Sequence, residues 1–285
     1  TIIKAGSMIG SGLFLVPATI AFHLHSSLAV MAIWVVGGIV SLFGALSVAE
    51  LGAMMPKAGG QYVYLREAYG PVWGFLYGWS AFACINTASI AAVAATFALY
   101  LGYFFPMSPA ERSAVAIASI VVLTVINCFG IKFGAIVQNG FTLLKIGSLL
   151  LLAFLSFVLS GGAIGNFSPV LPTEPLSGLA GPLMLAMIAA LFAYDGWIEI
   201  TYVAGEVKHP GRTLPRSLFL STVIVIGLYV AINGGLIYLL PLRTMAGSQM
   251  VASDAATLIA GTWGAAAVSI AVVLSTFGAN NGFIF

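Results

Sequence analysis

The sequence predicts an all-α polytopic membrane protein in which the first and the sixth apolar helices are broken. Hydrophobic residues make up 61% of the 285 residues and charged residues only 6%, whereas about a quarter of the residues in a soluble domain are charged. Three glycines, Gly6, Gly10 and Gly12, interrupt the otherwise apolar first segment, and Asp195-Gly196 interrupts the sixth. Unwound backbone is tolerated inside a bilayer only where it faces protein or a watery cavity. Both interruptions therefore mark candidate sites.

The chain divides into about eight apolar segments when about 20 residues are required to span a bilayer. They run over 1–24, 28–55, 71–105, 112–130, 134–160, 179–204, 214–240 and 262–285. We also expect a short interfacial helix over 60–69, and a short capped helix over 253–258 before the last segment. The chain lacks an initial methionine and stops inside an apolar run, so we expect a piece of a longer protein. All of 1–285 is interpreted as a single transmembrane domain.

Loop charges predict the orientation, because cytoplasmic loops carry an excess of Lys and Arg. The start of the chain and the even-numbered loops hold Lys4, Lys57, Arg66, Lys132, Lys208, Arg212 and Arg216, whereas the opposite loops hold only Arg112 and Arg243. We therefore expect the N-terminal end to be cytoplasmic. The net charge of +2 gives no reason to expect nucleic acid. Cysteine and histidine spacings show no disulfide framework or metal motif, so no metal or cofactor is expected.

At the interruption of the first segment, main-chain groups are expected to lose their helical partners. The N–H groups of Gly10, Ser11 and Gly12 begin the following half-helix, whose positive dipole end suits a carboxylate. The carbonyls of Ser7, Met8 and Ile9 end the preceding half-helix and suit an ammonium. The alternative is a close-packed helix face, because two of the glycines are spaced four residues apart.

The interruption of the sixth segment follows the same logic. A carboxylate near the bilayer centre is costly, so it normally faces a functional cavity. Asp195 could attract an amine, cap the second half-helix or bind a proton. The aromatic residues beside it could wall a pocket or only pack between helices. The candidate binding residues here are Phe192, Ala193, Tyr194, Asp195, Gly196 and Trp197. Two broken helices at corresponding places in two halves indicate the substrate site of a secondary transporter.

Lys145 lies about 16 Å along the fifth segment and therefore near mid-bilayer. A buried ammonium needs oxygen partners. We expect these to be carbonyls around Ile9 and Gly10 and the hydroxyls of Ser275 or Thr276. The alternative is an ion pair that holds helices together.

With these residues in hand, the chain resembles the amino acid–polyamine–organocation superfamily, and within it the L-amino acid transporter group. The stretches that carry the resemblance are Gly6–Phe14, Ala49–Pro56, Gly59–Leu65, Phe192–Trp197, Gly205–Pro210 and Leu214–Arg216, with Ser275–Gly278 similar to the eighth segment of the group. The resemblance implies a LeuT-type fold of twelve helices with an inverted five-helix repeat. This chain would then be truncated to about eight segments, with the first repeat over about 1–160 and the start of the second over about 179–285.

The resemblance also implies roles for individual residues. The substrate carboxylate would meet Ser11 and Gly12, and the substrate amine would meet the carbonyls of Met8, Phe192 and Asp195. Lys145 matches the lysine that occupies the place of a sodium ion in sodium-independent relatives. Some relatives have glycine where Asp195 stands. Vertebrate relatives bond to a glycoprotein through a cysteine in the 3–4 loop. The loop 104–111 has no cysteine, so we expect a prokaryotic form without that disulfide-linked partner.

These observations together predict an inner-membrane, sodium-independent transporter of L-amino acids that works by exchange or proton coupling. One alternative is a carrier of polyamines or other organic cations, with Asp195 pairing the cation. Another is a membrane-embedded amino-acid sensor that binds without moving substrate. An enzyme is not expected, because no paired Asp motif, zinc spacing or Ser/His arrangement is present.

Overall fold

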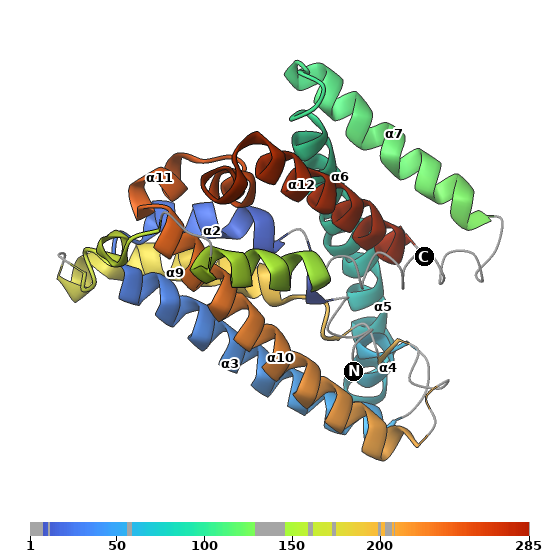
Figure 1. Cartoon of the computed structure of the whole chain (residues 1–285). Coiled ribbons are helices and arrows are strands. Elements are labelled where there is room, and N and C mark those ends of the chain that lie inside the picture. The colour runs from blue at the N-terminus through green and yellow to red at the C-terminus, as the bar shows by residue number, and fades with distance from the viewer. Residues whose placement is uncertain are drawn as a thin grey trace.

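Helices make up the described part of the chain, and no strand occurs in it. The computed structural model describes residues 8–10, 12–55, 59–128, 146–158, 162–172, 175–198, 201–202, 207 and 209–284. Its helices are α2 (Gly12–His23), α3 (Ser27–Met54), α4 (Gln61–Tyr69), α5 (Pro71–Ser80), α6 (Asn86–Leu101), α7 (Pro109–Cys128), an unlabelled helix (Ile146–Val158), α9 (Leu176–Tyr194), α10 (Pro210–Leu239), α11 (Leu242–Gly247) and α12 (Val251–Ile284). Figure 1 shows their arrangement.

Five stretches among the described residues are helical, long and apolar enough to cross a membrane. They are α3, the continuous stretch Pro71–Leu101, α7, α10 and α12. Three shorter apolar helices, namely α2, Ile146–Val158 and α9, lie inside the first, fifth and sixth predicted segments. Each predicted segment thus contains an apolar helix, and two of the three short ones flank the expected breaks.

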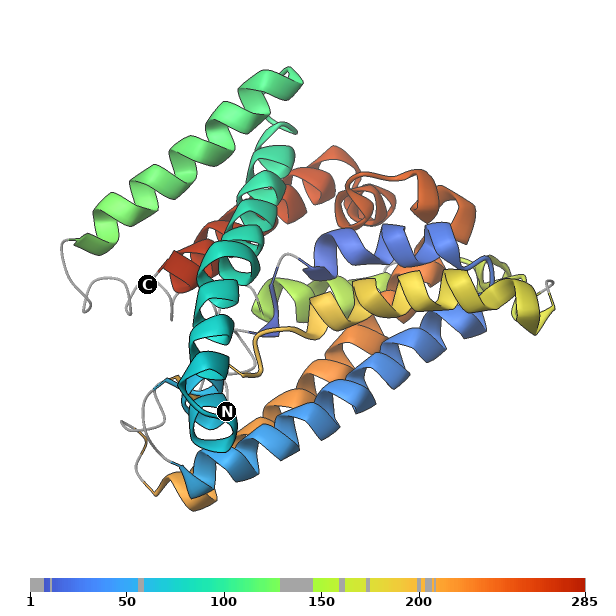
Figure 2. The same ribbon diagram turned by 180° about the vertical axis from the view of Figure 1, so that it is seen from behind.

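The long helices α3 and α10 lie side by side in antiparallel directions, as Figures 1 and 2 show. Glycines on α3 set their separation. A Cβ on Gly38 would lie 2.5 Å from Cγ1 of Ile226, and one on Gly52 would lie 3.2 Å from Cδ1 of Leu214. Small residues at such positions let membrane helices approach closely. The core between α3, α9 and α10 is consequently tight.

The third predicted segment contains an irregularity that the sequence analysis did not anticipate. A short π-helix, Ala81–Ile85, joins α5 to α6. The hydroxyl of Thr87 donates to the carbonyl of Phe82 at 2.6 Å, five residues earlier. π-bulges inside α-helices are frequent at functional sites. This one lies directly before α6, which contains Ser89.

Both short helices that were predicted outside the spans are present. The one predicted over 60–69 is α4, which follows Gly60 and packs against α5. The helix expected over 253–258 forms the first part of α12, which bends at Ala260-Gly261, where Gly261 has a φ of 61°. The part of α12 after this bend packs against α6 and α7. Its contact with α7 includes a hydrogen bond of 3.0 Å from Asn127 Nδ2 to Asn281 Oδ1.

Candidate functional site

The first helix break lies directly before α2. Met8 and Ile9 are buried, and Gly10 has no helical conformation before α2 begins at Gly12. The N–H of Gly10 donates to the carbonyl of Met8 at 3.0 Å, which closes a tight turn. The helix is thus interrupted here as predicted, and the Gly10 N–H is bonded within this turn in place of a helical partner. Ser11 lies outside the described residues.

The second helix break follows α9. Asp195 is extended, with φ −58° and ψ 162°, and Gly196 has a φ of 101°. Only glycine adopts such a φ without a steric penalty, which explains why the helix ends where the sequence reads Asp-Gly. The N–H of Asp195 donates to the carbonyl of Phe192 at 3.2 Å. This carbonyl, which was expected to be free for an amine, is therefore engaged as well.

The two breaks are in direct contact. A Cβ built on Gly12 would lie 2.8 Å from the Cα and 3.1 Å from the Cβ of Ala193, which is closer than atoms of this kind approach in proteins. A Cβ on Gly10 would meet nothing within 4 Å. The two glycines of the predicted site thus differ: Gly12 is required by packing, and Gly10 borders open space.

Tyr229 of α10 ties the two breaks together. Its hydroxyl lies 3.1 Å from the carbonyl oxygen of Met8 and 2.9 Å from that of Ala193, and its side chain is fully buried. A phenol has one hydrogen to donate, so the two carbonyls share it. No motif marks Tyr229 in the sequence. Its position in the middle of an apolar span is the one sequence feature that could indicate a role, because a buried phenol usually has a hydrogen-bond partner.

Around this junction lies a small cavity. It has a volume of about 30 Å³, which is room for about one water molecule and not for an amino acid. Both breaks, α6 and the end of α12 supply its lining residues, which are Met8, Gly10, Gly12, Ser89, Val93, Phe192, Ala193, Asp195 and Phe283. The structure thus brings together most of the predicted binding residues. It adds Ser89, Val93 and Phe283, which no motif marks in the sequence.

The predicted aromatic residues Tyr194 and Trp197 point toward α3 and do not line this cavity. The hydroxyl of Tyr194 donates to the carbonyl of Trp34 at 2.9 Å, and its ring centroid lies 6.1 Å from that of Trp34. A Cβ on Gly44 would lie 3.1 Å from the indole of Trp197. Of the two roles that the sequence left open, this conformation places both residues in helix packing.

The predicted coupling residues are described only in part. Lys145 lies outside the described residues. Ser275 is buried, and its Oγ has no hydrogen-bond partner among the residues that the structure describes. The hydroxyl of Thr276 instead donates to its own helix, at 2.8 Å from the carbonyl of Val272. Of the two hydroxyls expected to meet an ammonium, only that of Ser275 is unengaged.

Charges are scarce around the site. Asp195 is exposed at the cavity, and within the described ranges the one ion pair is the distant Arg66–Glu67, at 3.3 Å. Those ranges also contain no cluster of His, Cys, Asp or Glu that could hold a metal ion. The arrangement offers main-chain groups, one carboxylate and one hydroxyl around a small space between unwound helices. It can bind a small polar molecule, and it contains no set of side chains suited to covalent chemistry.

A family model described as "Amino acid permease" matches residues 1–285, which is the entire chain. The chain belongs to the amino acid permease family. The chain is similar to the serine/threonine exchanger SteT of Bacillus subtilis. The two sequences are 36% identical over 280 residues, which cover 97% of this chain and 62% of the relative. The superfamily resemblance seen in the sequence is thereby confirmed.

Two animal relatives are also similar to this permease chain. The human b(0,+)-type amino acid transporter 1 is 31% identical over 290 residues, covering 99% of this chain and 58% of the relative. The mouse Asc-type amino acid transporter 1 is 33% identical over 290 residues, covering 98% and 54%. The chain thus spans between about half and two thirds of the length of these relatives. Permease membership and the apolar helices together make it part of an integral membrane protein.

Proposed function

We propose that the protein containing this chain transports L-amino acids across the membrane by alternating access around the junction of the two helix breaks. The observation that carries the proposal is the contact of Gly12 with Ala193 beside a cavity that both breaks line. Broken helices that meet near mid-membrane form substrate sites in secondary transporters. The relatives are named as transporters and an exchanger of amino acids, which supports the same substrate class.

Substrate binding would require the junction to open. The cavity admits about one water, and the groups proposed to bind the substrate are engaged with one another: Gly10 with Met8, and Asp195 with Phe192. An amino acid would replace these bonds, its carboxylate meeting Ser11 and Gly12 and its amine meeting the freed carbonyls. While substrate is absent, the Gly10–Met8 and Asp195–Phe192 hydrogen bonds satisfy these main-chain groups, because buried N–H and C=O groups need partners.

Transport would be independent of sodium. A fixed ammonium at Lys145 would repel a cation from the same place, because two unit charges at 4 Å repel by about 4 kcal/mol at an effective dielectric near 20. Replacing sodium by choline in the uptake buffer at constant pH should leave the initial uptake rate unchanged. A large loss of uptake would contradict the lysine surrogate.

The setting proposed for this transporter is the inner membrane, with the N-terminal end in the cytoplasm and no disulfide-linked heavy chain. The described cysteines, Cys84 and Cys128, are unpaired and lie in the helical stretch Pro71–Leu101 and in α7. Labelling of single cysteines introduced at Ser248 and at His209, with a membrane-impermeant maleimide, tests the orientation. In intact cells, the maleimide should react with the cysteine at position 248 and not with the cysteine at position 209.

Two other functions make different predictions. Asp195, an exposed carboxylate at the cavity, favours a carrier of organic cations as the second candidate. A sensor would bind an amino acid without moving it. An uptake assay separates the amino-acid transporter, the organic-cation carrier and the sensor. It uses the full-length protein in proteoliposomes that are loaded with unlabelled serine. Labelled serine or labelled putrescine is then added outside. We expect serine to accumulate and putrescine not to. Binding of serine without uptake would instead indicate a sensor.

A further inference from the structure

A second, larger cavity lies far along the molecule from the helix breaks. It has a volume of about 680 Å³ and is formed where α2 ends, where α10 ends and where α11 begins. The residues that line it are Phe22, His25, Ser168, Pro169, Pro241, Leu242, Arg243 and Ala246. They lie near the end of α10 opposite to Pro210, and none of them lines the cavity at the breaks.

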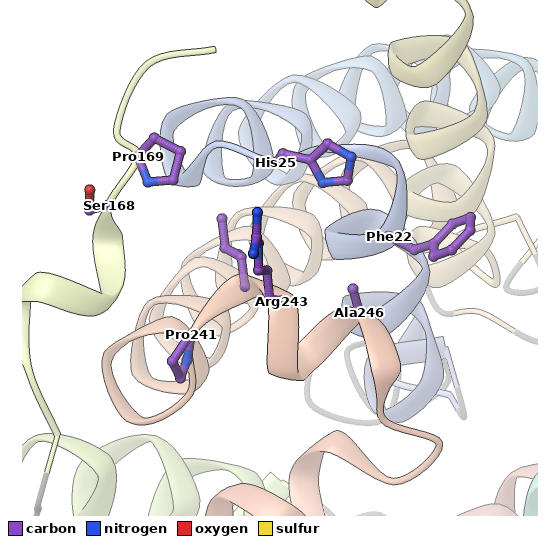
Figure 3. Close-up of a pocket in the computed structure, with 8 residues that line it drawn as sticks. Phe22, His25, Ser168, Pro169, Pro241, Arg243 and Ala246 are labelled. Carbon is purple, nitrogen blue, oxygen red and sulfur yellow. The ribbon is translucent and has the colours of Figure 1, made fainter. Parts of the chain in front are cut away.

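The cavity is lined mainly by apolar side chains, together with the Ser168 hydroxyl and two exposed nitrogen-bearing side chains, those of His25 and Arg243. Figure 3 shows the His25 ring and the Arg243 side chain directed into the same space, with Pro169 and Phe22 on either side. Neither side chain has an ion-pair partner in the described part of the chain, where Arg66–Glu67 is the one pair found. Among the described residues, no acidic side chain lines the cavity. An exposed guanidinium that has no described ion-pair partner and lies beside apolar side chains attracts an anion.

The wall of this cavity is held in place by hydrogen bonds to both long helices. The N–H of Ser27 donates to the carbonyl of Pro169 at 3.1 Å, and the Ser27 hydroxyl donates to that of Phe167 at 2.6 Å. On the other side, Asn166 Nδ2 donates to the carbonyl of Tyr238 at 2.9 Å. The floor is Leu242, which is 5% exposed. The site is therefore formed before any ligand arrives, as is usual for small-molecule sites.

We infer that this cavity binds an anionic amphiphile. Its phosphate or carboxylate would lie between His25 and Arg243, and its apolar part would lie against Phe22, Pro241 and Leu242. A zwitterionic amino acid fits less well, because none of the described lining residues has a carboxylate to pair with its ammonium. His25 can donate a hydrogen bond in either protonation state. Because His25 follows α2 and Arg243 belongs to α11, the bound anion would connect these two elements.

Two sources could supply this chemistry: an anionic lipid headgroup or a free organic anion. The test uses the full-length protein in a neutral detergent, with affinities measured by isothermal titration calorimetry. The probes are dihexanoyl phosphatidylglycerol, dihexanoyl phosphatidylcholine, hexanoate and inorganic phosphate. We expect the phosphatidylglycerol to bind more tightly than the phosphatidylcholine. Binding of hexanoate or phosphate with the same dependence on Arg243 would support the site and identify a free anion as its ligand.

Variants then locate the binding. Arg243→Gln should weaken it by about tenfold or more, because a charge-assisted hydrogen bond is lost. His25→Gln should weaken it less, and Ala246→Phe should block it by filling the cavity without changing a charge. The matched controls are Arg212→Gln, at the opposite end of α10, and His23→Gln, which does not line this cavity. Affinity that is unchanged in both Arg243→Gln and Ala246→Phe, or absence of binding by all four probes, would overturn the inference.

Discussion

Gly12 and Ala193 pack backbone against backbone, so that a Cβ on Gly12 would lie 2.8 Å from the Cα of Ala193. The two residues are far apart in the sequence, and each belongs to one of the two broken helices. Their contact gives Gly12 a packing role in addition to the main-chain binding role proposed for it. This contact and the hydrogen bonds of the Tyr229 hydroxyl both join the two breaks.

Gly12→Val should destabilise the protein and abolish substrate binding. The added methyl groups overlap the backbone of Ala193, and overpacking of this kind costs about 1–3 kcal/mol. Thermal unfolding in detergent and equilibrium binding of labelled amino acid measure the two effects. Gly227→Ala in α10 is the matched control, since a Cβ there meets nothing within 4 Å. Wild-type substrate affinity in Gly12→Val would show that Gly12 is not part of the substrate site.

Gly10→Ala should behave differently from Gly12→Val. The protein has space for a Cβ at Gly10, so the melting temperature should stay within the range of the Gly227→Ala control. Substrate affinity should nevertheless fall, because the methyl group enters the space that a bound carboxylate needs to approach the main chain. A variant with both normal stability and normal affinity would show that the substrate does not approach this glycine.

Tyr229→Phe should loosen the junction while keeping its shape. The substitution leaves two buried carbonyls, those of Met8 and Ala193, without the hydroxyl they share, which costs about 1–3 kcal/mol. We expect a lower melting temperature and a changed uptake rate. Tyr238→Phe is the control, because no hydrogen bond of the Tyr238 hydroxyl occurs in the described part of the structure, and its ring stacks on Phe157. Equal effects of the two substitutions would mean that the shared hydrogen bond contributes nothing.

Ser275→Ala tests the partner proposed for Lys145. A buried hydroxyl without a partner is unfavourable, so its removal should be neutral or stabilising if Ser275 meets no ammonium. If Lys145 donates to the Ser275 hydroxyl, Ser275→Ala should slow uptake more than it weakens substrate binding.

Lys145→Ala should likewise slow uptake more than it weakens binding. Lys145→Arg should also slow uptake, because a planar guanidinium does not replace a compact charge. Wild-type uptake by either lysine variant would contradict the coupling role.

The sequence by itself determined the membrane class, the positions of the apolar segments and the places of both breaks. These are local properties. Hydropathy over about 20 residues decides insertion, and a glycine cluster or an Asp-Gly pair ends a helix through its own backbone preferences, as the φ of 101° at Gly196 confirms. The bend at Gly261, before the last segment, follows from the same kind of local signal.

Only the tertiary structure decided which groups meet. Tyr229 lies far from both breaks in the sequence, and its role depends on the position of α10 beside the carbonyls of Met8 and Ala193. Tyr194 and Trp197 stand beside Asp195 in the sequence, yet they point to Trp34 and Gly44, because the direction of a side chain depends on how its helix is rotated against its neighbours. The partners of the Gly10 N–H and the Phe192 carbonyl likewise depend on dihedral angles within the breaks. Local composition predicts that a helix stops, and the surrounding packing determines what the freed chain touches.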